Sequence, residues 1–515
     1  MSVAEKLTII AENQKKVYDA GFAAGKAQGG GGGGTYGENE IIFYDYDGTI
    51  VYSCTIEEAN NLTELPTPPE HEGLIFQEWN YTLEEVNSTT HILDIGAMYD
   101  TYEIRTDIID GVETSYVVHP VRLYMDLPDD GINIETNFGV GYFANYGADG
   151  NKANKAMIDW GDGSPYSVSS ADTVDYYGNY ITNHTYESAG KYVIKIFAHP
   201  DNLQLVDGEY VPKGRLFSIS NVTNALLNRT TDRLYCKGME FGSICNGFVN
   251  GGKPGASHTV KFITFTSKAR LCSSSLYSLN YFAGVSHISV PKGNTIISYG
   301  GFGNNMVKSI SLPNTITSCA AYAFPPSLQR LVIPDSVTSL TAPFINSAPA
   351  SGNYRTLYLS NQLSSYPANM CQGQVLDNLY MGSNVSSFGS SCFRESGLRK
   401  FVFENDVTGT LSQIFYGCTC LNEVIFKGNI ESISSNCFYN CSSLVHVEFV
   451  PSTVKNSISF AQSSALSKAS IQSIIDGLVD LTDGTAQTLT LHADVKAKLT
   501  ESQIAAITSK NWTLA

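Results

Sequence analysis

Three stretches near the C-terminal end decide the fold, because each repeats one six-residue pattern. They read LRKFVF at residues 398–403, LNEVIF at 421–426 and LVHVEF at 444–449. In each stretch the first, fourth and sixth residues are apolar. Because side chains alternate along a strand, the fourth and sixth residues point to one face. The stretches start 23 residues apart, which indicates stacked copies of one structural unit.

The same pattern holds over nine stretches with a narrow period. A unit of this length cannot bury its apolar face alone, so neighbouring copies must stack into a continuous core. The spacing therefore predicts a solenoid. The middle apolar residues recur every 21 to 26 residues, at Ile263, Ile288, Ile310, Leu331, Leu357, Leu379, Phe401, Val424 and Val447.

Two further features narrow the type of repeat. A second apolar cluster precedes several strands, as in Cys392-Phe393 and Cys437-Phe438, and three early strands are followed by prolines, at Pro291, Pro313 and Pro334. Together these features resemble the BspA-type (Treponema-type) leucine-rich repeat. The resemblance implies a leucine-rich-repeat solenoid over residues 223–450.

A solenoid exposes its core at its end and needs a cap. Residues 451–515 are predicted to form an α/β cap, with a helix at 468–480, a strand at 488–492 and a helix at 500–510. The last helix starts at a sequence that resembles a capping box, Thr500-Glu501-Ser502-Gln503. Trp512 is expected to pack at the end.

Ten of the eleven cysteines follow residue 235, within the repeat region. Their spacing, as at Cys418 and Cys420, completes neither a zinc site nor a clear disulfide framework. Cysteine packs well as a small apolar side chain. We expect most of these cysteines to be reduced and buried in register.

The region before the solenoid has two further predicted domains. Residues 38–90 alternate short strands and helices, and resemble the β-grasp-like repeat module of Listeria and Bacteroides surface proteins through the segment His71 to Trp79. Residues 91–222 have strand patterns throughout and predict a β-sandwich. Their Trp160-Gly161-Asp162-Gly163 and His184-Thr185-Tyr186 motifs resemble a polycystic-kidney-disease-type (PKD) domain, an immunoglobulin-like spacer.

The N-terminal segment is predicted to attach the protein to a larger assembly. Residues 1–28 have the spacing of a coiled-coil-like helix, whose apolar stripe includes Val3, Leu7, Ile10 and Val17. Residues 29–37 form a linker that contains six consecutive glycines. Such a helix cannot dock firmly across this linker, so we expect it to oligomerise, most simply as a homotrimer.

Charge divides the chain into two parts. The whole chain has a formal charge of −17, which argues against a nucleic-acid partner. Residues 37–222 carry 8 basic and 31 acidic residues, whereas residues 223–515 carry 20 basic and 15 acidic residues. No apolar run is long enough to cross a bilayer, so membrane insertion is not predicted.

Catalytic signals are weak, and neither an enzyme, a cofactor nor a metal is predicted. Asp45 and Asp47 lie in a DxDGT motif like that of haloacid-dehalogenase-type phosphatases, but the alternating strands and helices of that fold do not follow. A hairpin turned at Asp47-Gly48 is the preferred interpretation. The carboxylate oxygens of Asp159 and Asp162 are of the type that binds Ca²⁺. In a turn of this kind we expect them to accept hydrogen bonds from backbone amides instead.

The predicted binding face is the column of outward-facing residues between the strand anchors. At its centre this column is aromatic and apolar, with basic residues beside it. Aromatic surfaces with polar rims suit sugars and protein partners. The candidate binding residues are Tyr358, Tyr380, Val402, Ile425, Arg330, Arg355, Arg399 and Lys400.

These features predict a modular adhesin. The first reading is a virion-associated bacteriophage tail or fibre protein, because the N-terminus lacks the apolar stretch of a secretory signal. Its helix would bind other virion proteins, and its solenoid a host-surface glycan or protein. The alternative is a bacterial cell-surface leucine-rich-repeat adhesin, and a phosphatase is a third, disfavoured reading.

Overall fold

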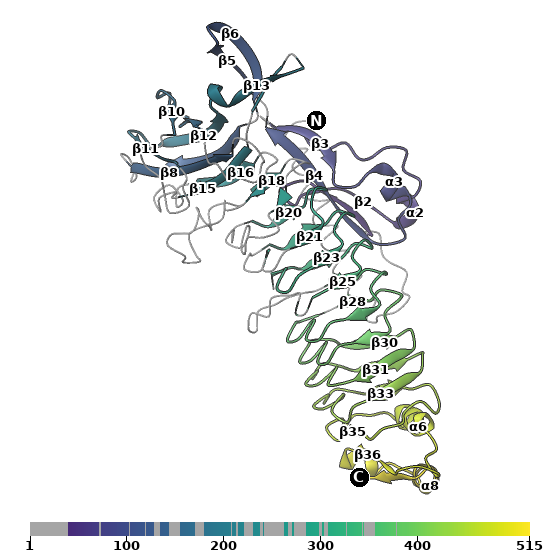
Figure 1. Ribbon diagram of the computed structural model, residues 1–515. Coiled ribbons are helices and arrows are strands. Elements are labelled where there is room, and N and C mark those ends of the chain that lie inside the picture. The colour runs from purple at the N-terminus through teal and green to yellow at the C-terminus, as the bar shows by residue number, and fades with distance from the viewer. Residues whose placement is uncertain are drawn as a thin grey trace, which may run out of the picture.

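The computed structural model describes most of the chain from Glu40 onwards. The described residues are 40–71, 74–101, 103–118, 120–127, 134–143, 155–169, 180–207, 209–212, 215–220, 230–236, 240–241, 262–265, 270–271, 285–297, 301–302, 307–325, 327–341, 343, 356–376 and 378–515. Within them, three parts follow one another: a small α+β domain, a β-sandwich and a long solenoid (Figure 1). The predicted N-terminal helix, with Val3, Leu7, Ile10 and Val17, and the glycine linker lie outside the described residues.

The small domain is a four-stranded sheet with two short helices. The strand order is β2-β1-β4-β3, with β1 and β4 parallel and the other neighbours antiparallel. Both helices begin at a capping box, at Thr55 and at Thr82. The elements are β1 (Ile41–Tyr44), β2 (Ile50–Cys54), α2 (Ile56–Ala59), β3 (Leu74–Trp79), α3 (Leu83–Asn87) and β4 (Leu93–Thr101).

The predicted boundary of this domain at residue 90 is wrong. Strand β4 follows that boundary, yet it lies inside the sheet between β1 and β3. Its side chains are buried along its whole length, from Leu93 to Thr101. Strand β4 ends at Thr101 and β5 begins at Glu103, so no linker in the sequence marks where the small domain ends.

The β-sandwich has one three-stranded sheet and one six-stranded sheet. The first has the order β11-β8-β15, and the second has the order β10-β9-β12-β7-β16-β18. Trp160 is fully buried between them, and its indole nitrogen donates to the Ser167 hydroxyl at 2.8 Å. The strands are β7 (Val121–Leu127), β8 (Ile134–Phe143), β9 (Ala156–Asp159), β10 (Ser167–Val168), β11 (Tyr180–Tyr186), β12 (Gly190–Ala198), β15 (Arg215–Ser220), β16 (Thr230–Cys236) and β18 (Phe262–Phe265).

The six-stranded sheet crosses the predicted boundary between residues 222 and 223. Strand β16 pairs antiparallel with β7 of the sandwich and parallel with β18, which is the first strand of the solenoid. Two separate hairpins project beyond the sandwich: β5 (Glu103–Ile109) with β6 (Val112–Val118), and β13 (Leu203–Val206) with β14 (Glu209–Pro212). The sandwich and the solenoid therefore share one sheet, and no boundary separates them at residue 222.

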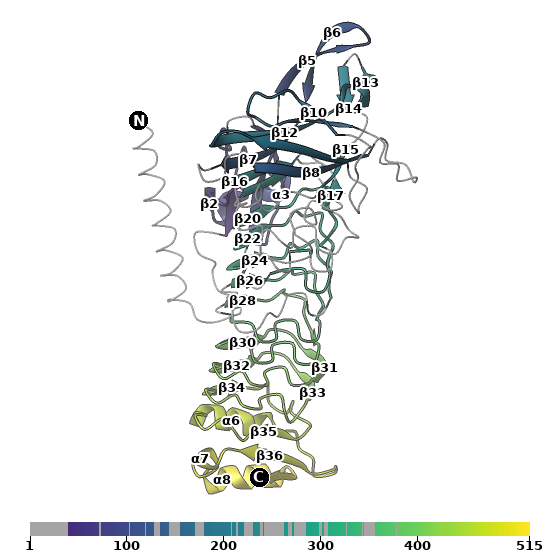
Figure 2. The same ribbon diagram turned by 90° about the vertical axis from the view of Figure 1, so that its left-hand side faces the viewer.

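The solenoid is built from two ladders of short parallel strands on its opposite sides (Figure 2). In the first ladder the predicted middle residues pair in register, as Ile288 with Ile310 and Val424 with Val447. This ladder is β20 (His287–Ser289), β22 (Ser309–Ser311), β24 (Arg330–Val332), β26 (Thr356–Tyr358), β28 (Asn378–Tyr380), β30 (Lys400–Phe403), β32 (Glu423–Phe426) and β34 (His446–Glu448).

The second ladder lies on the other side of the core. It consists of β21 (Ile296–Ile297), β23 (Ser318–Cys319), β25 (Ser339–Leu340), β27 (Ser365–Tyr366), β29 (Ser387–Phe388), β31 (Val407–Leu411) and β33 (Ile430–Ile433). Between the ladders, equivalent aromatic side chains stack from rung to rung. Phe403 and Phe426 lie 4.4 Å apart between ring centroids with an interplanar angle of 4°, and Phe449 extends the stack. The repeat pattern of the sequence is thus confirmed.

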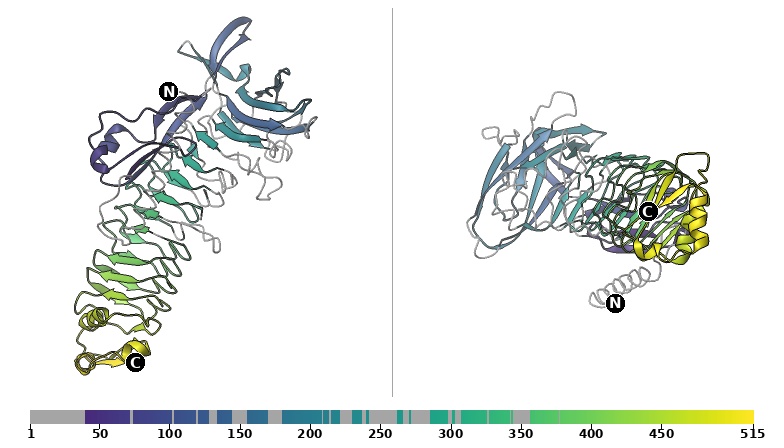
Figure 3. Two further views of the ribbon diagram at one scale, coloured as in Figure 1. Left: turned by 180° about the vertical axis from the view of Figure 1, so that it is seen from behind. Right: turned by 90° about the horizontal axis from the view of Figure 1, so that it is seen from below.

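The end of the solenoid is closed by an α/β cap (Figure 3). Thr500 forms the predicted capping box with Gln503, and Trp512 is buried with its indole nitrogen donating to the Val479 carbonyl at 2.8 Å. The sequence did not predict the short helix α7. The elements are β35 (Ile458–Phe460), α6 (Lys468–Gly477), β36 (Gln487–Leu491), α7 (Ala493–Lys496), α8 (Glu501–Ser509) and β37 (Trp512–Leu514).

The eight cysteines whose side chains the structure describes are free thiols, and all but one are buried. Burial raises the pKa of Cys418 to about 11 and that of Cys319 to about 12. Their predicted role as apolar core residues is confirmed by this burial, and Cys420, which is exposed, is the exception among the described cysteines. Among the described helices, none is long and apolar enough to span a membrane.

Candidate functional site on the strand face of the solenoid

The first ladder presents two columns of outward-pointing side chains, which we call the strand face. Alternation along each strand places these residues on either side of a buried middle residue. One column is His287, Ser309, Arg330, Thr356, Asn378, Lys400, Glu423 and His446. The other is Ser289, Ser311, Val332, Tyr358, Tyr380, Val402, Ile425 and Glu448.

The small domain covers the part of the strand face nearest the sandwich. Strand β4 contacts β18, β20 and β22 (Figure 1). The Asn80 amide nitrogen donates to the Val290 carbonyl at 3.2 Å and to the Ser311 carbonyl at 3.3 Å, and the Tyr81 hydroxyl donates to the Leu312 carbonyl at 2.8 Å. The covered part, which we call the upper face, consists of His287, Ser289, Ser311, Arg330, Val332 and Tyr358.

A glycine allows the two backbones to approach closely. A methyl group on Gly96 of β4 would collide with the side chain of Ser289, so no other residue fits here without movement. The side-chain carbonyl oxygen of Asn80 accepts a hydrogen bond from the Gly96 backbone amide at 2.7 Å. The docked surfaces are therefore matched at the level of backbone and small side chains.

A buried ion pair lies at the centre of this interface. The Arg330 Nε donates to the Asp94 carboxylate oxygens at 2.9 and 3.1 Å, and Asp94 is only 2% exposed. Burial is the largest single effect and lowers the pKa of the Arg330 guanidinium, but the Asp94 charge and hydrogen bond, together with Tyr358 and Tyr44, raise it overall. The guanidinium also lies 4.8 Å from the centroid of the Tyr358 ring. Docking of the small domain onto the solenoid therefore brings the Asp94 and Arg330 charges together.

His287 is buried under Tyr44 of the small domain in a neutral setting. Its ring stacks on Tyr44 of the small domain with 4.8 Å between centroids, and its nitrogens lie 2.7 Å from the Ser309 hydroxyl and 3.1 Å from the Ser289 hydroxyl. Burial lowers the pKa of His287 to about 3. The imidazole is therefore neutral at physiological pH.

The prediction that Arg330 and Tyr358 form an open binding surface is wrong. Tyr358 is 8% exposed and packs with Val332 against Ile92, which precedes β4. The six-residue pattern shows which side chains leave the sheet, but it holds no information on what covers them. Tyr380 stacks on Tyr358 at 4.4 Å and stands half-buried at the edge of the covered area. Arg355 lies outside the described residues.

The rest of the strand face is open, and we call it the lower face. Tyr380, Val402 and Ile425 form an apolar strip along successive rungs, although Val402 is itself only 4% exposed. Beside the strip, the Lys400 ammonium and the Glu423 carboxylate form an ion pair at 2.8 Å. Arg399 is exposed and adds a positive charge next to Lys400. Five of the eight predicted binding residues thus lie together here.

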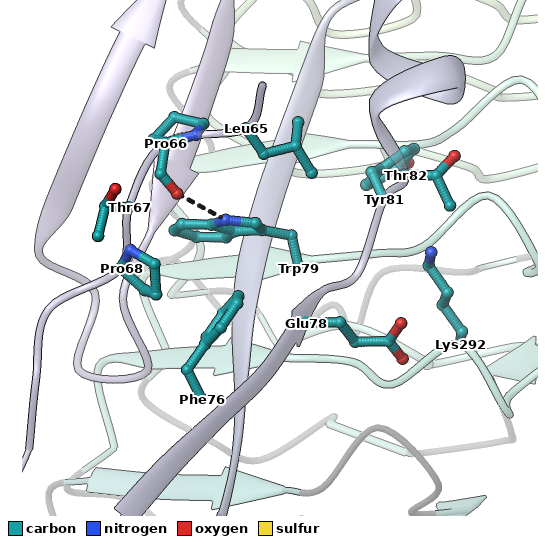
Figure 4. Close-up of a pocket in the computed structure, with 10 residues that line it drawn as sticks. All are labelled: Leu65, Pro66, Thr67, Pro68, Phe76, Glu78, Trp79, Tyr81, Thr82 and Lys292. Carbon is teal, nitrogen blue, oxygen red and sulfur yellow. Dashed lines mark hydrogen bonds between the residues drawn. The ribbon is translucent and has the colours of Figure 1, made fainter. Parts of the chain in front are cut away.

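A pocket of about 430 Å³ lies where the small domain meets the first rungs. The Pro-rich turn, with Pro66 and Pro68, forms its wall together with Phe76 and Trp79, and the Trp79 indole nitrogen donates to the Pro66 carbonyl at 3.0 Å (Figure 4). Leu65, Thr67, Glu78, Tyr81, Thr82 and Lys292 complete the lining. The sequence did not predict this pocket, because Lys292 is more than 200 positions away from the other residues.

The carboxylates that suggested chemistry make structural contacts in their own turns, and Asp45 and Asp162 also lie 2.8 Å from the ring nitrogens of His71 and His184. Asp45 and Asp47 flank the turn of the antiparallel β1–β2 hairpin, where Gly48 has a φ of 88°, so the preferred hairpin interpretation is confirmed. Asp159 and Asp162 accept backbone amides of their own turn at 2.9 and 3.0 Å. Among the described residues, no group of three or more His, Cys, Asp or Glu is placed to hold a metal.

Comparison with known families identifies the repeats. Residues 273–396 and 364–478 match the family described as BspA type leucine rich repeat region. Residues 273–478 of the chain thus match the BspA-type leucine-rich-repeat family. The lower face thus belongs to the BspA-type region, whereas the pocket joins this region to the small domain. A search of the curated proteins gives no match to the chain.

Several solved structures are similar to the chain at low identity. A leucine rich cell surface protein from Faecalibacterium prausnitzii shares 16% identity over 59% of this chain and 88% of its own, with a TM-score of 0.25. A leucine-rich repeat protein from Bacteroides ovatus shares 12% identity over 59% of this chain and 95% of its own, with a TM-score of 0.26. The pneumococcal vaccine antigen PcpA shares 14% identity over 61% of this chain and 87% of its own, with a TM-score of 0.25. Scores this low carry no argument about function.

Proposed function

We propose that the protein is a non-enzymatic leucine-rich-repeat adhesin of a bacterial cell surface, and that its lower face binds a protein on another surface. One observation carries the proposal: the upper face of the same ladder already binds a protein domain. There, β4 and Ile92 cover outward side chains of successive rungs. The lower face continues the same two columns without a cover among the described residues.

The chemistry of the lower face suits a protein partner. Tyr380 and Ile425 supply an aromatic and an aliphatic anchor, and the Lys400–Glu423 pair supplies a charged rim. Protein interfaces combine such a central apolar cluster with a polar edge, and aromatic anchors dominate their binding energy. Arg399 adds an exposed positive charge that would steer an acidic partner. The predicted glycan partner remains the competing ligand class.

The surface location rests on the repeat type, and the other predicted location has less support. The BspA-type match favours the bacterial cell-surface alternative over the virion. The virion reading depends on the N-terminal helix and glycine linker, which lie outside the described residues. A homotrimer formed by that helix, and its attachment to other assembly proteins, stay proposals.

Cell binding tests the lower face directly. Fluorescently labelled full-length protein would be incubated with a panel of bacterial and animal cells, and binding measured by flow cytometry. The variant Tyr380→Ala with Ile425→Ser should lose about 2 kcal/mol or more of binding energy, which is roughly thirtyfold in affinity. Treatment of the cells with protease should remove the binding, whereas glycosidases should not.

Val445→Ser is the matched control, because Val445 is an exposed aliphatic residue on the neighbouring rung but does not belong to the two columns. It should bind as the wild type does. Equal binding by the wild type and the lower-face variant would overturn the proposal. Loss of binding after glycosidase treatment alone would replace the protein partner with a glycan.

A further inference from the structure

We propose that the pocket between the small domain and the solenoid binds an organic cation, an ammonium or guanidinium group on an apolar stem. The pocket volume of about 430 Å³ falls within the range of about 300–1,000 Å³ that is usual for small-molecule sites. Its lining combines an apolar wall with two charged side chains, as Figure 4 shows. This site is independent of the lower face.

A bulge in β3 brings the aromatic wall and the acid together. The register of β3 against β4 shifts between Phe76, which faces Tyr99, and Glu78, which faces Met98, so Gln77 is the extra residue. An extra residue reverses the alternation of the strand. Phe76 and Trp79 therefore both reach the core side, with ring centroids 5.6 Å apart. The Glu78 side chain, which faces Met98, lines the pocket from the other side of β3, towards Lys292 (Figure 4).

Charge selects the kind of ligand. Lys292 already has a partner, because its ammonium lies 3.6 Å from the carboxylate of Glu85. Within the residues that the structure describes, the half-buried Glu78 carboxylate has neither a hydrogen bond nor an ion pair. These three groups carry a net charge of −1, which attracts a cation and repels an anion.

The aromatic wall favours an organic cation over a bare metal ion. Ammonium and guanidinium groups interact with the faces of Trp and Phe rings in addition to carboxylates. The wall formed by Pro66, Pro68, Phe76 and Trp79 also provides apolar surface for a stem of methylene groups. A single carboxylate beside such a wall is a poor site for Mg²⁺ or Ca²⁺, which need several oxygen ligands.

The same chemistry is offered by a free amine and by a lysine or arginine side chain of a protein. Four probes separate these sources: N-acetyl-lysine N-methylamide, the equivalent arginine derivative, the uncharged norleucine derivative and 1,5-diaminopentane. Each would be titrated into the full-length protein at low salt by calorimetry and by Trp fluorescence. The lysine derivative should bind about tenfold more tightly than norleucine. Tighter binding of the diamine would identify a free amine, and tighter binding of the blocked residues a protein side chain.

Three variants make the test specific to this pocket. Glu78→Gln keeps the size of the side chain and should weaken lysine-derivative binding about tenfold. Lys292→Gln removes the positive charge at the site and should strengthen binding roughly threefold. Glu84→Gln changes an exposed carboxylate on α3 and should have no effect. Equal affinities for the lysine and norleucine derivatives, or unchanged binding by Glu78→Gln, would overturn the proposal.

Discussion

The covered half of the strand face buries several polar side chains, whereas the open half still carries apolar ones. The upper face is buried, yet it contains His287, Ser289, Ser311 and the Arg330 charge. The lower face has no cover among the described residues, yet it carries the partly exposed Tyr380 and Ile425. Polar groups are buried only where partners satisfy them. The upper face is therefore built for one specified partner, the small domain of the same chain.

The two halves therefore differ in what holds them together. The upper rungs depend on contacts made from outside the solenoid, including a charge pair and a close backbone approach at Gly96. The lower rungs depend on their own core, in which Phe403, Phe426 and Phe449 stack in register. Changes to the docking contacts should affect only the upper half, and the following predictions test that difference.

Removing the buried carboxylate should have the largest effect. Asp94→Ala leaves the Arg330 guanidinium buried without its partner, which typically costs about 3–5 kcal/mol. We expect β4 and the rungs from β20 to β26 to exchange backbone amides faster, with the rungs from β30 to β34 unchanged. Hydrogen exchange followed by mass spectrometry would measure both halves at once.

The double variant Asp94→Leu with Arg330→Met is the control for this prediction. It removes both charges and should restore most of the lost protection, because an apolar pair needs no counter-ion. Faster exchange in the rungs from β30 to β34 of Asp94→Ala would show that the two halves are one cooperative unit.

Acid should weaken docking through His287. Its folded pKa is about 3, whereas the unfolded value is about 6.5. Only the unfolded or undocked state takes up the proton easily. The contribution of neutral His287 to stability is therefore complete above about pH 6.5 and is lost as the pH falls towards 3. Between pH 7 and pH 4.5 we expect a loss of about 2–3 kcal/mol.

Thermal unfolding of the wild type and of His287→Gln across this pH range would check the prediction. The variant should be less stable at pH 7 but should show a shallower dependence on pH. An identical slope would assign the acid sensitivity to other groups, such as His91, whose pKa is also lowered by burial.

The two stacked tyrosines should differ, although the sequence predicted one role for both. Tyr358→Ala removes a buried ring that contacts Ile92 and should destabilise the docked state by about 2–3 kcal/mol. Tyr380→Ala removes a half-buried ring and should cost about 1 kcal/mol. Denaturant unfolding of both variants would compare them, and equal losses would mean that Tyr380 is covered as fully as Tyr358.

The smallest effects are expected at the helix caps. Thr82→Ala in the small domain and Thr500→Ala in the solenoid cap each remove a capping box, at about 1 kcal/mol. Thr82→Ala should loosen the upper half and Thr500→Ala only the end of the lower half. Local hydrogen exchange would locate each effect, and a response of β4 to Thr500→Ala would contradict the separation of the two halves.

The repeat could be predicted from the sequence because one burial requirement recurs in every rung. Each copy places apolar residues at the same positions, as Ile310 and Val424 do, so a weak local signal is repeated many times. The cap was predicted in the same way, from helix starts such as Thr500 that depend only on neighbouring residues.

The docking of the small domain could not be predicted, because its contacts join residues far apart in the chain. Asn80, Asp94 and Gly96 contact carbonyls and side chains more than 190 positions away, and no local pattern distinguishes them. The bulge at Gln77 is equally hidden, since a strand with one extra residue has no signature in composition. Consequently six of the predicted site residues, Arg330, Tyr358, Tyr380, Lys400, Val402 and Ile425, lie in the outward-facing columns but do not form a single open surface.

The position of β4 across several rungs has a mechanical consequence. A repeat array loses its terminal units first, since each unit is held mainly by its neighbours. Heat or a pulling force that enters at the cap would therefore peel the solenoid from the C-terminal end. Peeling should stop where β4 and Ile92 bridge the rungs from β20 to β26, because those rungs must detach from the bridge together. The small domain thus limits how many rungs of the solenoid can unfold from the C-terminal end.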